Sequence, residues 1–257
     1  MEFIFSGTGT SQGVPVIGCE CEVCMSDDPR DKRLRTSGIL RSAKTTICFD
    51  AGPDFRQQML REDIKVLDAV VFTHQHKDHT AGLDDVRAYN FRLKRDMPVY
   101  ATEAVIEHLR REYYYIFEQS DYPGVPRLDL REINASPFQV GDLHLTPLPL
   151  MHGKMPVFGY RIGDFAYITD ANQISDLALA RLKGVRYLTL NALRKEKHHS
   201  HFNLEEAVAV AQQIGAEQTY LLHISHLMGR HAVVSRELPS GIQFAYDGLR
   251  IAWKPSE

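Results

Sequence analysis

The feature that most constrains this chain is the run His74-Gln75-His76-Lys77-Asp78-His79, which begins where a short apolar segment, residues 69–73, ends. Imidazole and carboxylate groups together are the ligands that Zn²⁺ and similar first-row divalent ions prefer. If the run is a tight loop entering a helix near Thr80, its alternate residues can face two neighbouring ions. His74 and His76 would bind one ion. Asp78 and His79 would bind the other.

Two further apolar segments end in residues of the same chemical type. Asp170 follows Tyr167-Ile168-Thr169, and His223 follows Tyr220-Leu221-Leu222. The carboxyl ends of strands are where α/β sheets generally present ligands. We therefore expect these residues to lie near the histidine run.

Strand-like and helix-like segments alternate along the chain, which predicts an α/β protein with mixed sheets. The 257 residues contain no repeat and no linker-like stretch, so we expect one domain over residues 1–257. The tail predicts a hairpin, 242–245 and 249–253, turned at Asp247-Gly248. The other predicted strands are 2–6, 45–50, 69–73, 99–101, 143–147, 157–162, 165–169, 185–190 and 219–223, and the predicted helices are 55–61, 83–91, 102–117, 175–182 and 204–214.

The segment Val71–Gly82 resembles the signature of the metallo-β-lactamase-fold hydrolases. Within them, the chain is similar to the phosphoribosyl 1,2-cyclic phosphate phosphodiesterases of the carbon–phosphorus lyase pathway, the PhnP type. The motifs that resemble this subgroup are Gly7-Thr8-Gly9-Thr10-Ser11-Gln12-Gly13-Val14-Pro15, Cys19-Glu20-Cys21-Glu22-Val23-Cys24, Pro147-Leu148-Pro149-Leu150-Met151-His152, Tyr167-Ile168-Thr169-Asp170-Ala171, His201-Phe202-Asn203-Leu204 and Leu222-His223-Ile224-Ser225-His226.

The resemblance implies a four-layer αββα sandwich with a dinuclear metal site at one edge of the sheets. It implies that His74, His76 and His152 hold one ion. Asp78, His79 and His223 would hold the second, and Asp170 would bridge the two. Asp50 would brace the site by hydrogen bonding, which suits a carboxylate beside metal-bound imidazoles.

Three cysteines, Cys19, Cys21 and Cys24, lie within six residues. Such spacing indicates metal more than disulfide in a cytosolic chain, but a closed zinc site needs a fourth ligand. By resemblance to the subgroup, His226 supplies it and completes a structural zinc site. The alternative is three free thiols on a flexible loop. Cys48 is expected to be a small buried apolar residue.

His201 matches the position at which the subgroup has its general acid, whereas His198 and His199 suit a solvated loop. Imidazole is well suited to protonate a leaving oxygen near neutral pH. Many members of this subgroup have an aspartate at the position of Asn191. The asparagine would remove a negative charge near the loop of His201, which would change the pKa of His201 or the substrate that the protein accepts.

These expectations combine into a hypothesis for a phosphodiesterase. Two divalent ions, zinc or manganese, would hold a bridging hydroxide that attacks phosphorus, with Asp78 orienting it and His201 protonating the leaving group. The substrate would be 5-phosphoribosyl 1,2-cyclic phosphate or a similar cyclic diester. Lys154 and Arg194 would grip a distal phosphate.

Three other functions share parts of these motifs. They are a tRNA 3′-end endonuclease, a thiolester hydrolase of the glyoxalase II type, and a non-catalytic metal-binding protein of the same fold. The formal net charge of −3 and the lack of a basic insertion argue against a nucleic-acid partner. No segment resembles a membrane span or a signal peptide, so we expect a cytoplasmic protein. The resemblance also implies a homodimer.

Overall fold

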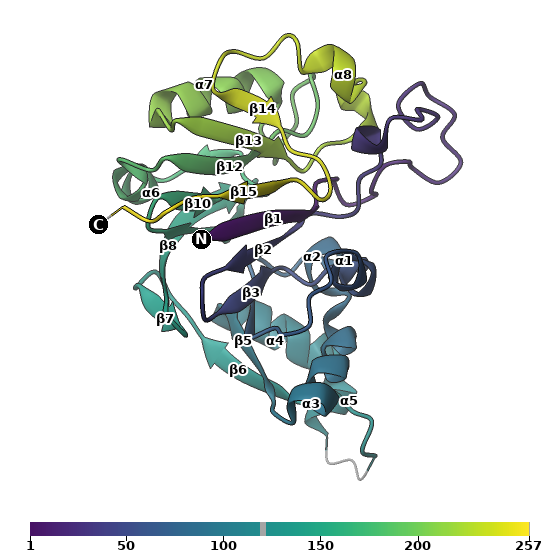
Figure 1. Cartoon of the computed structure of the whole chain (residues 1–257), viewed down its shortest axis with the longest axis vertical. Coiled ribbons are helices and arrows are strands. Elements are labelled where there is room, and N and C mark those ends of the chain that lie inside the picture. Colours follow the sequence, from purple (N-terminus) through teal and green to yellow (C-terminus); the bar gives the residue numbers. More distant parts are fainter. Residues whose placement is uncertain (119–121, 257) are drawn as a thin grey trace.

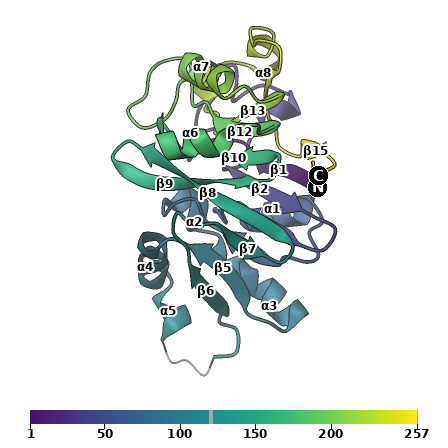
Figure 2. The same cartoon turned by 90° about the vertical axis from the view of Figure 1, so that its left-hand side faces the viewer.

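Two β-sheets packed face to face, with helices on their outer faces, make up the fold (Figure 1). This computed structural model describes residues 1–118 and 122–256. A view turned by 90° shows α6 and α7 beside one sheet and α3, α4 and α5 beside the other (Figure 2). The predicted αββα sandwich is therefore confirmed.

The first sheet has the strand order β15-β1-β2-β3-β4-β5-β6, and the strands of its parallel part, β3 to β6, alternate along the chain with the helices that cover it. Its strands are β1 (Glu2–Gly7), β2 (Ser37–Arg41), β3 (Thr46–Phe49), β4 (Ala69–Val71), β5 (Met97–Ala101), β6 (Leu128–Glu132) and β15 (Arg250–Ala252). The helices of this half are η1 (Pro29–Asp31), α1 (Phe55–Arg61), α2 (Lys77–Thr80), η2 (Leu83–Val86), α3 (Arg87–Leu93), α4 (Glu103–Glu112) and α5 (Tyr114–Phe117).

The second sheet has the order β11-β8-β9-β10-β12-β13-β14, with β7 paired to β8. Its strands are β7 (Phe138–Val140), β8 (Leu143–His152), β9 (Met155–Ile162), β10 (Phe165–Tyr167), β11 (Gln173–Ile174), β12 (Tyr187–Asn191), β13 (Gln218–Leu222) and β14 (Ile242–Phe244). Its helices are α6 (Asp176–Leu182), α7 (Leu204–Ile214), η3 (His226–Met228) and α8 (His231–Val234). Asn203 and Glu206 form a reciprocal capping box at the start of α7, and Gly215 ends it with a left-handed φ of 72°.

Aromatic rings fill the space between the sheets. Phe49 from the first sheet stacks on Tyr167 from the second, with ring centroids 4.7 Å apart, and Phe3 lies 4.5 Å from Phe165. Burial of this apolar area is the main force that holds the two sheets together. The packing brings together the end of β8 and the segments that follow β4, β10 and β13, and the candidate site lies there.

The predicted C-terminal hairpin is wrong. β14 pairs in parallel with β13 of the second sheet, whereas β15 pairs antiparallel with β1 of the first. The Asp247 carboxylate between them accepts hydrogen bonds from the backbone N–H groups of Thr8 at 2.9 Å and Leu34 at 2.8 Å. These bonds fix the turn against the N-terminal segment, so the tail crosses from one sheet to the other.

Most predicted strands and helices occur within a few residues of their expected places, while β2, β6, β7 and β11 were not predicted. Helix α2 begins at Lys77, earlier than expected, so Asp78 and His79 lie in its first turn. Among the residues described, no helix has the length and apolarity to cross a membrane.

Candidate metal centre

The seven expected ligands of the dinuclear site converge at one edge of the two sheets. His74, His76, Asp78 and His79 follow β4, His152 ends β8, and Asp170 and His223 follow β10 and β13. Their ligand atoms form two groups that share Asp170, and within each group all atoms lie within 4.8 Å of one another. The first group is His74, His76, His152 and Asp170, and the second is Asp78, His79, Asp170 and His223.

The second group has the spacing of a metal polyhedron. His79 Nε2 lies 3.3 Å from an Asp78 oxygen and 3.4 Å from an Asp170 oxygen. Tetrahedral zinc with metal–ligand distances of about 2.05 Å has ligand–ligand edges of roughly 3.3 Å. His79 Nε2 is buried and has no hydrogen-bond partner in the described structure. A buried polar atom without a partner is costly, and a bound cation would satisfy it.

Hydrogen bonds fix the orientation of two histidine rings. The Asp50 carboxylate lies 2.8 Å from His79 Nδ1 and also accepts a 2.8 Å bond from the Thr73 backbone N–H. The backbone carbonyl of Ser200 lies 2.7 Å from His152 Nδ1. With Nδ1 as donor in both rings, Nε2 is the free nitrogen that faces the site. The bracing contact that we expected of Asp50 is thus present.

Burial and neighbouring charges shift the pKa values of three residues in the two ligand groups. Burial opposes ionisation of Asp170, but His223 and His79 outweigh it and hold the pKa of that carboxyl well below its usual range. Burial likewise opposes protonation of His79, yet Asp170, Asp78 and Asp50 raise its pKa well above the usual value. His74, in contrast, is kept neutral, because burial lowers its pKa well below 6.5. Metal binding displaces protons from such ligands.

His201 lies beside both ligand groups. Its ring stacks on that of His223 at 4.8 Å and tilts against that of His152 at 4.5 Å, and its Nδ1 lies 4.0 Å from an Asp170 oxygen. This nitrogen is buried and has no partner among the described residues, and burial lowers the pKa of the ring to about 3. His201 therefore has an unused nitrogen beside both ligand groups.

The histidine-rich loop is less solvated than expected. His199 is exposed, but His198 is half-buried and its ring centroid lies 5.1 Å from that of His201. Arg194 of the same loop has a buried Nε atom without a partner in the described structure. Burial, followed by the charges of His199 and Arg194, lowers the pKa of His198.

Sequence analysis missed two threonines beside His223. Thr36 Oγ1 lies 3.1 Å from its Nδ1, and Thr10 Oγ1 lies 3.2 Å from its Nε2. Thr10 lies within the Gly7–Pro15 motif, which was its only signal. No local pattern distinguishes Thr36, because its contact depends on the pairing of distant segments.

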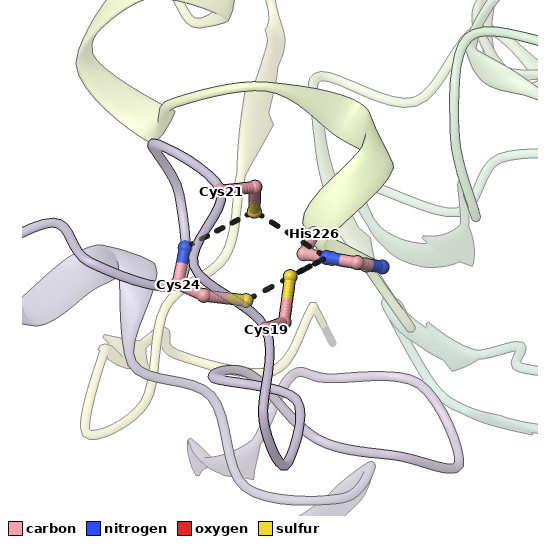
Figure 3. Close-up of side chains that lie close together, drawn as sticks. All are labelled: Cys19, Cys21, Cys24 and His226. Atoms are coloured by element: carbon pink, nitrogen blue, oxygen red, sulfur yellow. Dashed lines mark hydrogen bonds between the residues drawn. The ribbon is translucent and has the colours of Figure 1, made fainter.

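The cysteine cluster forms a third group near the site. The sulfur atoms of Cys19, Cys21 and Cys24 lie 3.3, 3.4 and 3.6 Å from His226 Nδ1, and the four groups point toward one another (Figure 3). Tetrahedral zinc with Zn–S of about 2.3 Å and Zn–N of about 2.05 Å has S–N edges of roughly 3.5 Å. A backbone N–H from Cys24 helps to lower the pKa of the Cys21 thiol to about 6, while burial raises that of Cys24 to about 11.

None of the four cysteines forms a disulfide, and Cys48 is fully buried as expected. His223 and His226 face different groups although only three residues separate them. The zinc-type group therefore connects the loop between β1 and β2 to the strand end that presents His223.

The chain is similar to known proteins in sequence and in structure. The family model described as Beta-lactamase superfamily domain matches residues 45–224. A solved structure described as a new diphosphatase from the PhnP family is 38% identical, covers 99% of this chain and 98% of its own, and superposes with a TM-score of 0.93. Zn²⁺-bound PqqB from Methylobacterium extorquens has the same fold, with 19% identity, coverage of 98% and 100%, and a TM-score of 0.77.

A curated relative from Porphyromonas gingivalis (strain ATCC BAA-308 / W83), named octanoyltransferase, is 44% identical over 252 residues. The match covers 97% of this chain and 51% of the relative. The chain thus spans about half the length of the curated relative that it matches.

Proposed function

Because the chain belongs to the PhnP family within the β-lactamase superfamily, we propose that it is a dinuclear-metal phosphodiesterase acting on a small phosphorylated substrate. The observation that best supports this is the pair of ligand groups that share Asp170, with the free nitrogen of His201 beside them. The fold implies divalent metal binding, and the donor set and the buried Nε2 of His79 fit it.

Each ligand group would hold one ion. His74, His76 and His152 would hold the first, and Asp78, His79 and His223 would hold the second. Asp170, which belongs to both groups, would be a ligand of each. Zinc and manganese both accept this mixture of imidazole and carboxylate. When bound, the two ions supply an acidified water and neutralise the charge that develops on phosphoryl oxygens.

The chain's own residues would orient the attacking water and transfer a proton to the leaving group. Asp78 lies at the open side of the second group and orients the attacking water. His201 donates a proton to the leaving oxygen from the opposite side of the phosphorus. Burial lowers the pKa of His201, and an anionic phosphate beside the ring would favour the protonated form.

Two substrate classes fit this arrangement. A cyclic diester such as 5-phosphoribosyl 1,2-cyclic phosphate would give ribose 1,5-bisphosphate, with Lys154 and Arg194 near the distal phosphate. A diphosphate is the second candidate, because the 38% identical PhnP-family structure is described as a diphosphatase. The alkoxide of the cyclic diester needs a proton, whereas phosphate is a better leaving group, so His201 matters more for the first class.

The name octanoyltransferase belongs to a protein about twice as long as the match. The acyl transfer named for that relative can therefore belong to the half of it that lies outside the match with this chain. The structure does not support acyl transfer through a cysteine, since Cys48 is fully buried and the other three thiols face His226.

The decisive experiment compares turnover of 5-phosphoribosyl 1,2-cyclic phosphate, linear diesters, diphosphates, octanoyl thiolesters and pre-tRNA by the zinc- and manganese-loaded protein. We expect turnover of a small phosphate ester and about two active-site ions plus about one structural zinc per chain. The variant H74A should lose activity with every substrate. Absence of phosphate-ester hydrolysis at full metal loading would overturn the proposal.

A further inference from the structure

The side chain of Asn191, at the end of β12, makes two hydrogen bonds to the backbone of a single residue. β12 lies between β10, which leads to Asp170, and β13, which leads to His223. The Asn191 side chain is fully buried. Its Oδ1 accepts from the Ala171 N–H at 2.8 Å, and its Nδ2 donates to the Ala171 carbonyl, also at 2.8 Å. The carboxamide therefore binds both polar groups of one residue.

That residue connects the two functional side chains. Ala171 directly follows Asp170, the residue shared by both ligand groups. The Ala171 carbonyl also accepts a 2.9 Å bond from the backbone N–H of Phe202, which directly follows His201. One carbonyl thus joins the backbone of the shared carboxylate to that of the proposed proton donor.

Asp170 needs such support. Its φ is +50°, a left-handed conformation that costs energy for a residue other than glycine. A residue in this conformation persists only when the surrounding hydrogen bonds hold it. The bond from the Ala171 N–H to Asn191 restrains the peptide that directly follows Asp170.

We propose that Asn191 is a positioning residue that fixes Asp170 and His201 relative to one another through the Ala171 backbone. The role of His201 in this proposal rests on the proposed function, whereas the effect on Asp170 concerns metal binding alone. The carboxamide both accepts from the N–H and donates to the C=O, which an ionised carboxylate cannot do. An ionised aspartate keeps the first bond but places a negative oxygen against the carbonyl oxygen, about 2.8 Å away in the present geometry.

The test uses the isosteric variant N191D with N90D as its matched control. Asn90 is also buried and makes the same kind of clamp on another residue, accepting from the Arg127 N–H and donating to its carbonyl. It lies in α3, away from the metal centre. Both variants should lose stability, so a general structural effect appears equally in both.

The first readout does not depend on activity. Zn²⁺ is titrated into the apo protein against a chromophoric chelator, and N191D should bind the active-site ions about tenfold more weakly, the size expected for a lost bond in a ligand's immediate support. N90D should match the wild type. Equal zinc affinity in all three proteins would overturn the proposal, whether or not the protein hydrolyses phosphodiesters.

The second readout examines His201. At saturating metal, kcat is compared for diphenyl phosphate, a poor substrate that needs leaving-group protonation, and bis-p-nitrophenyl phosphate, which needs little. N191D should lose about tenfold more rate on the first than on the second. Its deficit should shrink at lower pH, where a protonated aspartic acid can again donate to Ala171. A deficit equal for both substrates and independent of pH would assign Asn191 a structural role only. If the wild type hydrolyses neither ester, the proposed function fails and the zinc titration alone judges Asn191.

Discussion

Backbone strain is concentrated at three residues of the site. Asp50, Asp170 and His223 have φ values of 61°, 50° and 59°, and each follows the end of a strand. Left-handed conformations are costly outside glycine and cluster at functional sites, where the surrounding structure enforces them. The sharp turn lets a strand end present a carboxylate or imidazole inward instead of continuing along the sheet.

At the same scale, the variant H201A tests the proton donor. We expect it to keep its metals, because the seven ligands are intact, and to lose about 10²- to 10⁴-fold in kcat on diphenyl phosphate. Turnover of bis-p-nitrophenyl phosphate should fall far less, because nitrophenolate leaves without a proton. Metal analysis and the two rates check this. H199A, at the exposed neighbour in the same loop, is the matched control, and loss of metal in H201A would make His201 a ligand instead.

Because of His231, we expect the free energy of unfolding to decrease in acid. It is buried, its Nδ1 lies 3.1 Å from an Arg33 nitrogen, and burial followed by the Arg33 charge lowers its pKa from 6.5 to about 4. The folded state therefore binds this proton less readily than the unfolded chain. The resulting stability is present above pH 6.5 and is lost as the pH falls from 6.5 toward 4.

Glutamine at position 231 can still accept the Arg33 bond but does not titrate. Between about pH 7.5 and pH 5, the free energy of unfolding of the wild type should fall by about 2 kcal/mol more than that of H231Q. Urea unfolding at the two pH values measures this difference. Parallel losses in the two proteins would show that His231 is not responsible.

At the scale of elements, the cysteine group fixes the loop between β1 and β2, which has only a small apolar cluster of its own around Val14, Val23 and Cys24. The double variant C21S/C24S leaves two ligands, too few for a closed zinc site. We expect it to contain about one zinc ion fewer per chain and to show faster amide exchange over residues 11–30. C48S makes the same change at the buried fourth cysteine and should keep the zinc. Unchanged zinc content in the double variant would reject the site.

How far the sequence predicts these elements depends on whether their signals are local. Helix α7 was predicted at its observed bounds because its cap, its apolar spacing and Gly215 all lie within the segment. Strand β2 was missed because Gly38 reads as a turn residue. A Cβ at Gly38 would lie 2.2 Å from the Phe3 ring, so the position needs glycine for a contact with another strand.

The candidate site shows the same division. The histidine run and the residues at strand ends could be predicted from local patterns, since each follows an apolar strand. The neighbours Thr10, Thr36 and Asn191 could be assigned contacts only once distant segments were brought together. The C-terminal hairpin was predicted wrongly for a related reason. Asp247-Gly248 is a good turn sequence, and the bonds of Asp247 to Thr8 and Leu34, which direct the two strands to different sheets, depend on distant segments.

At the scale of the whole molecule, the metal centre joins the two halves of the sandwich. Four of its ligands follow β4 of the first sheet, and three come from β8, β10 and β13 of the second. Ions bound there act as a crosslink between sheets that otherwise adhere through apolar packing. Without them, the carboxylates of Asp78 and Asp170 lie close together beside His79, whose pKa they raise against the effect of burial.

Removal of the metals should therefore destabilise the entire fold and not only the site. A ligand at 100 times its Kd adds about 2.7 kcal/mol to the free energy of unfolding, and about 1 kcal/mol shifts Tm by roughly 2–4 °C for a domain of this size. We expect chelation of one active-site ion to lower Tm by about 5 to 10 °C, with recovery when zinc or manganese is returned. The variant D170N, which weakens both ligand groups, should start at the lower Tm, and chelator should lower its Tm further only by removing zinc from the cysteine group. C48S, which lies outside both groups, should respond as the wild type does. If metal analysis shows an emptied site while Tm is unchanged, the ligands are bound locally and the two sheets do not depend on the ions for their association.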